Sequence, residues 1–172
     1  MKRALIVVDY QNDFVSGALG FDGAEKLDEV ICRKIDDYKK DGDIIFTFDT
    51  HGENYLDTME GKNLPVPHCI DGSEGHKLFG KTAEKADESC FYFKKYTFGS
   101  LELAEFLKEK NYDSVELCGL VSNICVLSNA VLAKAALPDS EIIVDSKATS
   151  SADPEMDQKT FDILKGIHIK VL

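Results

Sequence analysis

One side chain that could do covalent chemistry is the thiol of Cys125, which lies where a helix is expected to begin. Cys125 comes shortly after an apolar stretch that ends at Gly119. A thiol in the first turn of a helix meets the positive end of the helix dipole, which favours the thiolate. The free backbone N–H groups of that turn can also bind an oxyanion. This combination is typical of a cysteine that attacks a carbonyl carbon, although an isolated cysteine is more often a small core residue.

Two other groups could assist such a thiol. Asp9 directly follows the aliphatic residues 4–8, and desolvation in such surroundings raises the pKa of a carboxyl toward that of a useful base. Lys94 and Lys95 follow another apolar stretch, and charge alone does not distinguish between them. An acid, an amine and a thiol are therefore available for one hydrolytic site, with a turn cap as the alternative role for Asp9.

A second group of polar residues could bind a metal ion. Asp49 and His51 are separated by one residue, and carboxylate and imidazole together are ligands of zinc, manganese and iron. They open a segment rich in polar residues and glycine, residues 50–88, and long loops in compact domains are usually functional. Candidate ligands within this segment are Glu53, Asp57, Glu60, His68 and His76.

The elements that must position these groups alternate between strands and helices. Apolar stretches predict strands at residues 4–8, 43–48, 90–93, 115–118, 141–144 and 168–172. Helical spacing and capping residues predict helices over 24–40, from Ser100, over 123–136 and over 154–165, the last capped by Asp153. Strands that are apolar on both faces indicate a parallel sheet covered by helices. We therefore expect a single α/β domain over residues 1–172.

Sites in such sheets form beyond the C-terminal ends of the strands. Asp9 and Asp49 each follow a predicted strand directly, and the lysine pair follows a third. Cys125 begins the helix after a fourth strand. We therefore expect these groups to meet at one edge of the sheet.

Composition and charge exclude several classes of protein. The 172 residues carry a formal net charge of −11, which would repel nucleic acid and anionic membranes. No apolar stretch approaches the roughly 18 residues that a membrane span needs. The five cysteines are scattered without a C-x-x-C pair, which argues against a disulfide framework or zinc ribbon. We expect a reduced cytoplasmic protein without a nucleic-acid or membrane partner.

Three sequence blocks carry a pattern shared with a known enzyme family. Residues 4–14, ALIVVDYQNDF, are similar to an opening D-x-Q-x-D-F, and residues 119–126, GLVSNICV, to G-x-x-[ST]-[DN]-x-C-V. Residues 95–100, KYTFGS, look like the lysine segment, which favours Lys95 over Lys94. Together these blocks resemble the isochorismatase-like cysteine hydrolases, and within them the nicotinamidase and pyrazinamidase type, in the same order over most of the chain.

The resemblance implies a three-layer α-β-α fold with a six-stranded, mostly parallel sheet of Rossmann-like order. It implies a catalytic triad of Asp9, Lys95 and Cys125. It also implies a cis peptide bond between Leu120 and Val121, and an oxyanion hole formed by the backbone N–H groups of Val121 and Cys125.

Nicotinamidases also carry a metal ion beside the triad. Asp49, His51 and His68 match its ligands, with His68 in a segment similar to the family's P-x-H-C-x-x-G. Members differ in the remaining ligand, which falls here at Asp57 or Glu60, and we favour Glu60. The resemblance thus implies a divalent metal cofactor, zinc first and manganese or iron as alternatives.

The implied reaction is hydrolysis of a small carboxamide through a cysteine thioester with release of ammonia. Nicotinamide is the preferred substrate, which would place the enzyme in NAD salvage. Family members are often homo-oligomers, so the resemblance also implies a homo-oligomer. We expect Phe14, Gln11 and Leu64 to contact the substrate. Residues 64–66, LPV, replace an aromatic residue that often stacks on the pyridine ring, so Phe14 is left to pack against it.

Four alternatives stay open. The first is another family hydrolase that acts on a carbamoyl, ureido or other small amide group. Isochorismatase itself cleaves a vinyl ether and needs neither a cysteine nucleophile nor a metal, so Cys125 and Asp49 argue against it. A non-catalytic dinucleotide-binding or interaction module is disfavoured because no G-x-G-x-x-G follows the first strand. The fourth is a metal-only hydrolase, which would keep its activity without Cys125.

Overall fold

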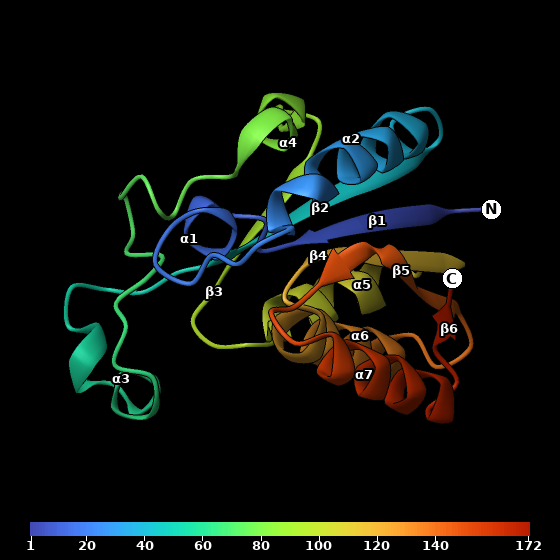
Figure 1. Ribbon diagram of the computed structural model, residues 1–172. Coiled ribbons are helices and arrows are strands. Elements are labelled where there is room, and N and C mark those ends of the chain that lie inside the picture. The colour runs from blue at the N-terminus through green and yellow to red at the C-terminus, as the bar shows by residue number, and fades with distance from the viewer.

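A six-stranded sheet forms the centre of the computed structural model, which describes residues 1–172 (Figure 1). Its strands are β1 (Arg3–Val8), β2 (Gly42–Asp49), β3 (Phe91–Lys95), β4 (Ser114–Leu120), β5 (Glu141–Ser150) and β6 (Lys170–Val171). They pair in the order β3-β2-β1-β4-β5-β6, and every pairing is parallel. This is the doubly wound Rossmann order, so the predicted α/β fold with six strands is confirmed.

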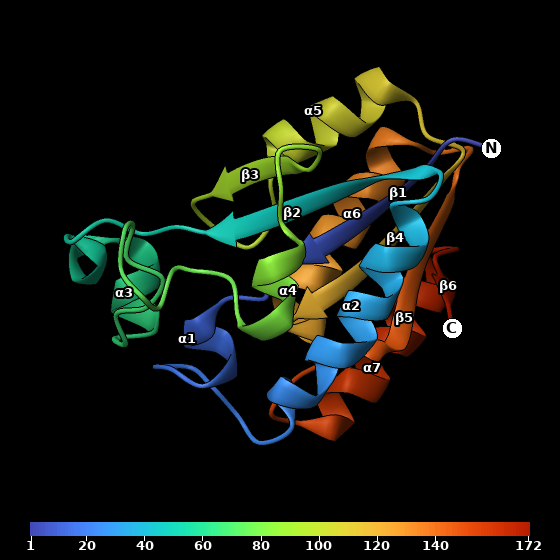
Figure 2. The same ribbon diagram turned by 90° about the horizontal axis from the view of Figure 1, so that it is seen from above.

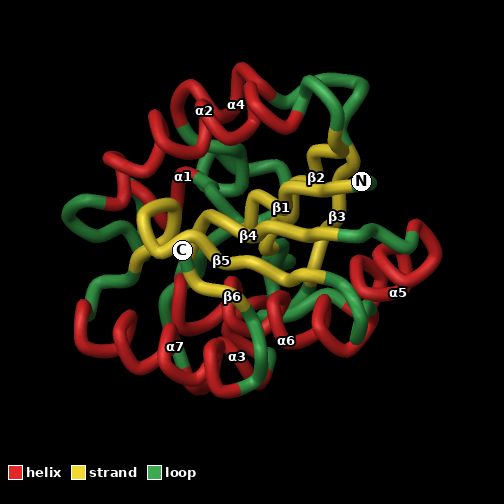
Figure 3. The backbone as a smooth tube through the Cα atoms, turned by 90° about the vertical axis from the view of Figure 1, so that its right-hand side faces the viewer, coloured by secondary structure: helices red, strands yellow, loops and turns green.

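Helices cover both faces of the sheet (Figures 1 and 3). One face carries α2 (Leu27–Tyr38), preceded by the 3₁₀ turn η1 (Ala24–Lys26), together with α1 (Asn12–Val15) and α4 (Gly80–Lys85). The other face carries α5 (Leu101–Lys110), α6 (Leu127–Ala136) and α7 (Pro154–Gly166). None of these helices has both the length and the apolar character needed to span a bilayer.

Strand β1 shows why the chain folds into three layers. Ala4, Ile6 and Val8 belong to the apolar cluster on the face of α5, α6 and α7, whereas Leu5 and Val7 belong to the cluster under α2. Successive side chains of a strand point to opposite faces. An uninterrupted aliphatic strand therefore needs a helical layer on each side, as the sequence indicated.

Two predicted helix starts are confirmed by their capping contacts. The Ser100 hydroxyl accepts a hydrogen bond from the Leu103 N–H at 3.1 Å. A carboxylate oxygen of Asp153 accepts one from the Glu155 N–H at 2.9 Å. Both side chains satisfy backbone donors that the first turn of a helix leaves free.

Three predicted boundaries differ from the structure. The helix expected over 123–136 begins as a π-helical turn, η3 (Ser122–Val126), before α6. The last strand contains only two residues rather than residues 168–172. Strand β5 continues to Ser150, well beyond the apolar residues 141–144, because its polar end pairs with β4 after a register shift. Pairing with a distant strand thus extends β5 where its own hydrophobicity does not.

The polar segment over residues 50–88 leaves the C-terminal end of β2, and its first part lies beyond the strand ends before α4 returns to the face of α2. It contains the 3₁₀ turn η2 (Tyr55–Asp57), α3 (Met59–Asn63) and α4. Figure 2 shows α3 past the arrowheads of β2 and β3. An isolated parallel β-bridge pairs His51 with Ile70. This bridge holds residues before and after α3 together beside the edge of the sheet.

Candidate active site

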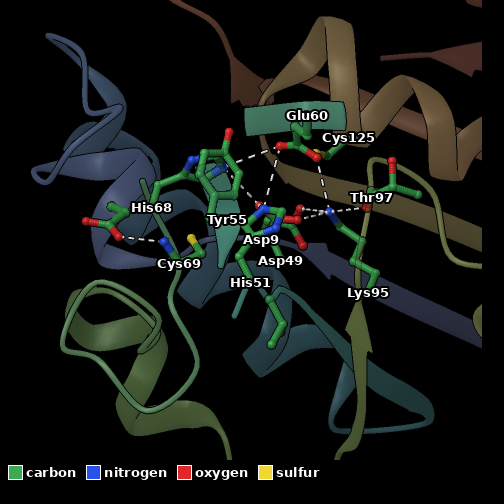
Figure 4. A network of polar contacts seen from close by, with 12 residues as sticks. Asp9, Asp49, His51, Tyr55, Glu60, His68, Cys69, Lys95, Thr97 and Cys125 are labelled. Atoms are coloured by element: carbon green, nitrogen blue, oxygen red, sulfur yellow. Dashed lines mark hydrogen bonds and ion pairs between the residues drawn. The ribbon is translucent and has the colours of Figure 1, made fainter. Parts of the chain in front are cut away.

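The strand ends bring the predicted reactive residues to one edge of the sheet (Figure 4). Asp9 follows β1, whereas Asp49 and Lys95 are the last residues of β2 and β3 and pair with each other in register. Cys125 lies in the π-helical turn that follows β4. The parallel strands therefore deliver an acid, an amine and a thiol to one place.

Lys95 is the centre of this group. Its side chain is 1% exposed, and its Nζ atom lies 2.5 Å from Asp9 Oδ2 and 3.2 Å from Asp49 Oδ1. The same Nζ lies 3.5 Å from the Sγ of Cys125 and donates to the carbonyl of Thr97 at 3.0 Å. Burial lowers the pKa of Lys95, but the negative charges of Asp9 and Asp49 outweigh it and raise that pKa. The ammonium ion is therefore the stable form at this site.

The neighbouring lysine has a different environment. Lys94 is exposed, and its Nζ lies 2.8 Å from both carboxylate oxygens of Asp71. Consecutive strand residues point to opposite sides, so only one member of the pair can face the site. That member is Lys95.

Asp9 is held in a buried and strained position. Its backbone φ is +43°, a left-handed conformation that costs a residue with a side chain about 1–3 kcal/mol and that clusters at functional sites. The Thr47 hydroxyl donates to Asp9 Oδ1 at 2.6 Å and accepts from the Asp9 N–H at 3.2 Å. Burial raises the pKa of the Asp9 carboxyl, and the charge of Lys95 opposes that rise. Asp9 is thus a stronger base than an exposed carboxylate.

The pKa of Cys125 departs from what the helix position alone suggests. The residue is 5% exposed. Burial and the charge of Asp9 raise the pKa of its thiol well above the usual value, and the charge of Lys95 only partly offsets this. Burial therefore opposes the thiolate that a helix start favours. Such a thiol needs a base to become nucleophilic.

The turn before Cys125 offers a free backbone donor. The peptide bond between Leu120 and Val121 is cis. The N–H of Val121 donates no hydrogen bond within the protein, and Val121 and Cys125 line the same cavity. This arrangement is compatible with the oxyanion hole expected from the sequence.

Four potential metal ligands converge next to the acid–lysine–thiol group. One ligand atom from each of Asp49, His51, Glu60 and His68 lies within 4.8 Å of the others. Asp49 Oδ2 is 2.9 Å from His51 Nε2 and 3.3 Å from His68 Nε2, and Glu60 Oε1 is 3.6 Å from each. Asp57 lies exposed on η2. The structure therefore brings Glu60, rather than Asp57, to the other three.

The imidazole of His68 is oriented for metal binding. Its Nδ1 lies 2.8 Å from the carbonyl of Val66, and a carbonyl can only accept, so Nδ1 carries a proton and the neutral ring would present the lone pair of Nε2 to an ion. A backbone acceptor of this kind is the usual second partner of a metal-bound histidine. Two imidazoles and two carboxylates are a donor set suited to zinc, manganese or iron, so these residues fit a divalent cation.

Asp49 joins the two groups. One carboxylate oxygen faces Lys95 and the other faces His51 and His68. Burial raises the pKa of Asp49, but the hydrogen bonds from the histidines and the charge of Lys95 outweigh it, so the pKa lies well below the usual range. Burial raises the pKa of Glu60. Asp49 therefore stays ionised between a lysine and the potential metal site.

A largely apolar cavity of about 280 Å³ opens onto these residues. Phe14 and Leu64 line it, as expected from the sequence. Its further lining residues are Leu19, Phe21, Asp49, Glu60, His68, Phe98, Val121, Asn123, Ile124, Cys125, Ser151, Ala152 and Asp153. A cavity of this kind can hold a small, mostly apolar molecule with one polar end against Cys125.

Gln11 does not line the cavity, which corrects its predicted role in substrate contact. Its Nε2 donates to the carbonyls of Asp49 and His76 at 3.0 and 2.8 Å, and its Oε1 accepts from the Asp49 N–H at 2.8 Å. All three of these hydrogen bonds join the buried amide to backbone groups of Asp49 and His76. Gln11 therefore supports the backbone of the site instead of lining the cavity.

Some residues of the site escaped the sequence analysis. The ring of Tyr55 lies 4.8 Å from that of His51 and 5.1 Å from that of His68, measured between centroids. Phe98 belongs to the cavity wall. Thr47 lies two residues before Asp49 on β2, and this period-two spacing is the one signal that could have identified a partner for Asp9.

The chain is similar to known proteins over nearly its whole length. A family model described as an isochorismatase domain matches residues 3–171. A nicotinamidase/pyrazinamidase of Mycobacterium tuberculosis is 30% identical over 169 residues, covering 88% of this chain and 89% of the relative. The structure of the nicotinamidase/pyrazinamidase PncA from Bacillus subtilis matches with a TM-score of 0.89 and 28% identity, covering 99% of both chains. A pyrazinamidase of Pyrococcus horikoshii in complex with zinc matches with a TM-score of 0.86 and 26% identity over 99% of this chain and 98% of the other.

Proposed function

The chain belongs to the isochorismatase family, and from that premise we propose that it is an amidohydrolase that converts nicotinamide to nicotinate and ammonia. The observation that carries the proposal is the buried contact of one lysine with a carboxylate and a thiol. Lys95 Nζ lies 2.5 Å from Asp9 and 3.5 Å from Cys125, and Cys125 lines an apolar cavity. This is the set of groups that hydrolysis through a thioester requires.

In the first half of the reaction, the Asp9 carboxylate takes the proton of the Cys125 thiol as Sγ bonds to the amide carbon. The carbonyl electrons move to oxygen, and the N–H groups of Val121 and Cys125 receive the oxyanion. Donors of this kind contribute about 2.7–4 kcal/mol each in comparable sites. The protonated Asp9 then gives its proton to the amide nitrogen, the C–N bond breaks, and ammonia leaves a thioester on Cys125.

In the second half, Asp9 takes a proton from water as the water oxygen bonds to the acyl carbon. The C–S bond breaks, and Asp9 returns its proton to Sγ. The acid product ionises in solvent. The ammonium group of Lys95 stabilises the carboxylate and the sulfur throughout, and its raised pKa keeps it charged. Asp9 thus shuttles one proton in each half-reaction.

We propose that Asp49, His51, Glu60 and His68 hold the divalent metal, with zinc as the preferred ion. The donor set and the fixed tautomer of His68 support this. When bound, such an ion supplies a Lewis acid that can bind a ring nitrogen or water beside the cavity. Asp49 would then share its carboxylate between the ion and Lys95.

Two further expectations remain predictions. The five cysteines are all free, which supports a reducing compartment such as the cytoplasm. A homo-oligomer is expected from the family resemblance alone, and light scattering of the purified protein tests it.

A second candidate function is hydrolysis of a different small amide by the same thiol. It is favoured by the aliphatic Leu64 in the wall of the cavity, at a part of the chain where relatives often carry an aromatic residue. Carbamoyl or ureido compounds would then be the substrates.

The test is an ammonia-release screen over nicotinamide, pyrazinamide, and carbamoyl and ureido compounds. Wild type is compared with Cys125→Ala and with Cys118→Ala, a control that removes another buried cysteine remote from the lysine. We expect release from nicotinamide by wild type and C118A, and none by C125A. Release from another amide only would redirect the substrate, whereas turnover by C125A would eliminate the thiol mechanism.

A further inference from the structure

Asn129 connects the nucleophile helix to the loop that follows the lysine strand. It lies in α6 and is 1% exposed. Its Nδ2 donates to the carbonyl of Cys125 at 2.8 Å and to that of Phe98 at 3.0 Å. Its Oδ1 accepts from the Ser100 N–H at 3.0 Å. One amide therefore joins the backbone of the nucleophile to two backbone groups of the loop over residues 96–100.

The position of this asparagine is not explained by the helix itself. Asparagine is a poor residue for a helix interior, and a buried amide is costly unless its hydrogen bonds are satisfied. Within its own helix, which η3 and α6 form together, the amide makes only the hydrogen bond to the Cys125 carbonyl. The two bonds to Phe98 and Ser100 compensate the burial, so the loop contacts are the physical reason for an amide at this place.

The loop itself packs closely on the same helix. A Cβ added at Gly99 would lie 2.7 Å from Leu132 Cδ1 and 3.5 Å from Ser128 Cβ, so the loop lies against α6 at this point. The loop begins next to the site, where Lys95 donates to the Thr97 carbonyl, and it ends at Ser100, the cap of α5. Between these two ends, the hydrogen bonds of the Asn129 side chain hold the loop against α6.

The side chain of Phe98, which this loop carries, lines two neighbouring cavities. Phe98 is 45% exposed and lines both the 280 Å³ cavity at Cys125 and a neighbouring cavity of about 490 Å³. Glu60, Leu64 and Ile124 line both cavities as well. Together with these residues, the Phe98 ring therefore bounds the space that is open to a molecule bound at Cys125.

We propose that Asn129 is a positioning residue that holds Phe98 at a fixed place relative to Cys125 and thereby sets the affinity of the site for a small ring amide. The inference rests on the proposed function, because it names a residue that shapes the same site. Asn129 acts through Phe98 and does not touch the reacting atoms.

The first test compares wild type with Asn129→Ala and with Ala133→Gly. Ala133 is buried one turn farther along the same helix, and its methyl group makes no hydrogen bond, so A133G weakens the helix without removing a hydrogen bond to residues 96–100. We expect N129A to raise KM for nicotinamide about tenfold while kcat changes less than about threefold, the pattern of lost uniform binding. A133G should leave KM unchanged. An equal rise of KM in A133G, or an unchanged KM in N129A, would overturn the inference.

The second test asks whether the effect passes through Phe98. In a cycle of Phe98→Ala, N129A and the double variant, N129A should raise KM far less in the F98A background than in wild type. A positioning residue loses its effect when the group that it positions is absent. Additive effects on KM would show that Asn129 acts by another route.

A third measurement does not depend on turnover. Hydrogen exchange of the peptide over residues 96–103 should accelerate in N129A and stay unchanged in A133G, because the Ser100 amide loses its acceptor. If wild type hydrolyses no amide, the proposed function fails and this measurement still decides the contact. Unchanged exchange in N129A would refute the fastening of the loop.

Discussion

At the scale of single residues, the ammonium group of Lys95 balances the negative charges of the site. Two buried carboxylates, Asp9 and Asp49, lie within ion-pair distance of one ammonium group. Buried charges of one sign are strongly unfavourable without a partner. The lysine therefore serves both the stability of the strand ends and the chemistry of Cys125.

The two adjacent lysines offer a matched comparison. Lys95→Met leaves Asp9 and Asp49 without their partner, so we expect a loss of about 3–5 kcal/mol in the free energy of unfolding. Amide hydrolysis should fall at least about 10²-fold, as when a charge-stabilising group is removed. Steady-state kinetics and urea unfolding measure both effects.

Lys94→Met is the control, because Lys94 pairs with Asp71 at the surface. Exposed pairs contribute about 0–1 kcal/mol, so stability and activity should stay near those of wild type. A large loss of activity in K94M, or its retention in K95M, would contradict the assignment.

Among the elements, strand β4 must pass close to β1 to deliver Cys125. Gly119 sits at this crossing with φ of +105°, and an added Cβ would lie 2.1 Å from the carbonyl oxygen of Val8. The end of β4 therefore depends on a glycine, and the turn that carries Cys125 depends on the end of β4.

Gly119→Ala should destabilise the protein more than Gly72→Ala. Both glycines have positive φ, but an added Cβ at Gly72 would contact nothing within 4 Å. The left-handed conformation costs an alanine about 1–2 kcal/mol at either position, and the backbone clash at Gly119 adds about 1–3 kcal/mol. Equal losses of unfolding free energy in urea would show that β1 and β4 are less closely packed at this point.

Lys39, the residue that follows α2, forms an ion pair with Asp87 in the loop before β3, and this ion pair depends on pH. Lys39 Nζ lies 2.5 Å from Asp87 Oδ2. The hydrogen bond from Lys39, followed by those from Ser89, holds the pKa of Asp87 well below its usual range. Because the folded pKa is lowered, this stabilisation is present above about pH 4 and is lost as pH falls through the folded pKa.

Asp87→Asn should therefore lower the melting temperature at pH 7 and have less effect as the pH approaches 2. Melting curves of wild type and variant across this range provide the measurement. A difference that stays constant with pH would mean that Asp87 stabilises the protein without its charge.

For the whole molecule, the potential metal site joins the segment 50–88 to the sheet. Asp49 ends β2, whereas Glu60 lies in α3 and His68 in the loop beyond it. A ligand that binds only the folded state stabilises it by mass action. Metal binding should thus stabilise the fold as well as serve the reaction.

Removal of the metal with a chelator should lower the melting temperature of the metal-loaded protein by about 5–10 °C, if the ion is present at about 100 times its Kd. Glu60→Ala should reduce bound metal, measured by elemental analysis, and should shrink this shift. Asp57→Ala is the matched control because Asp57 lies exposed outside the group. Loss of metal in D57A but not in E60A would reverse the ligand assignment.

Much of this architecture follows from local pattern. The aliphatic residues before Asp9 require burial on both faces, and that requirement alone predicts a parallel sheet covered by helices. Because parallel strands end at one edge, the sequence also predicts that Asp9, Asp49 and Cys125 share a site. Strand period and helix capping act over a few residues, so they can be read along the chain.

Other features depend on segments that are distant in sequence. Neither the fully used amide of Gln11 nor the role of Asn129 could be anticipated, because their partners lie in other elements. The raised pKa of Cys125 follows from burial, which only the packed core determines. The sequence by itself thus determined which reactive groups reach the sheet edge. Tertiary structure decided which of them touch and how their charges are balanced, because desolvation and hydrogen bonding arise from packing across the whole fold.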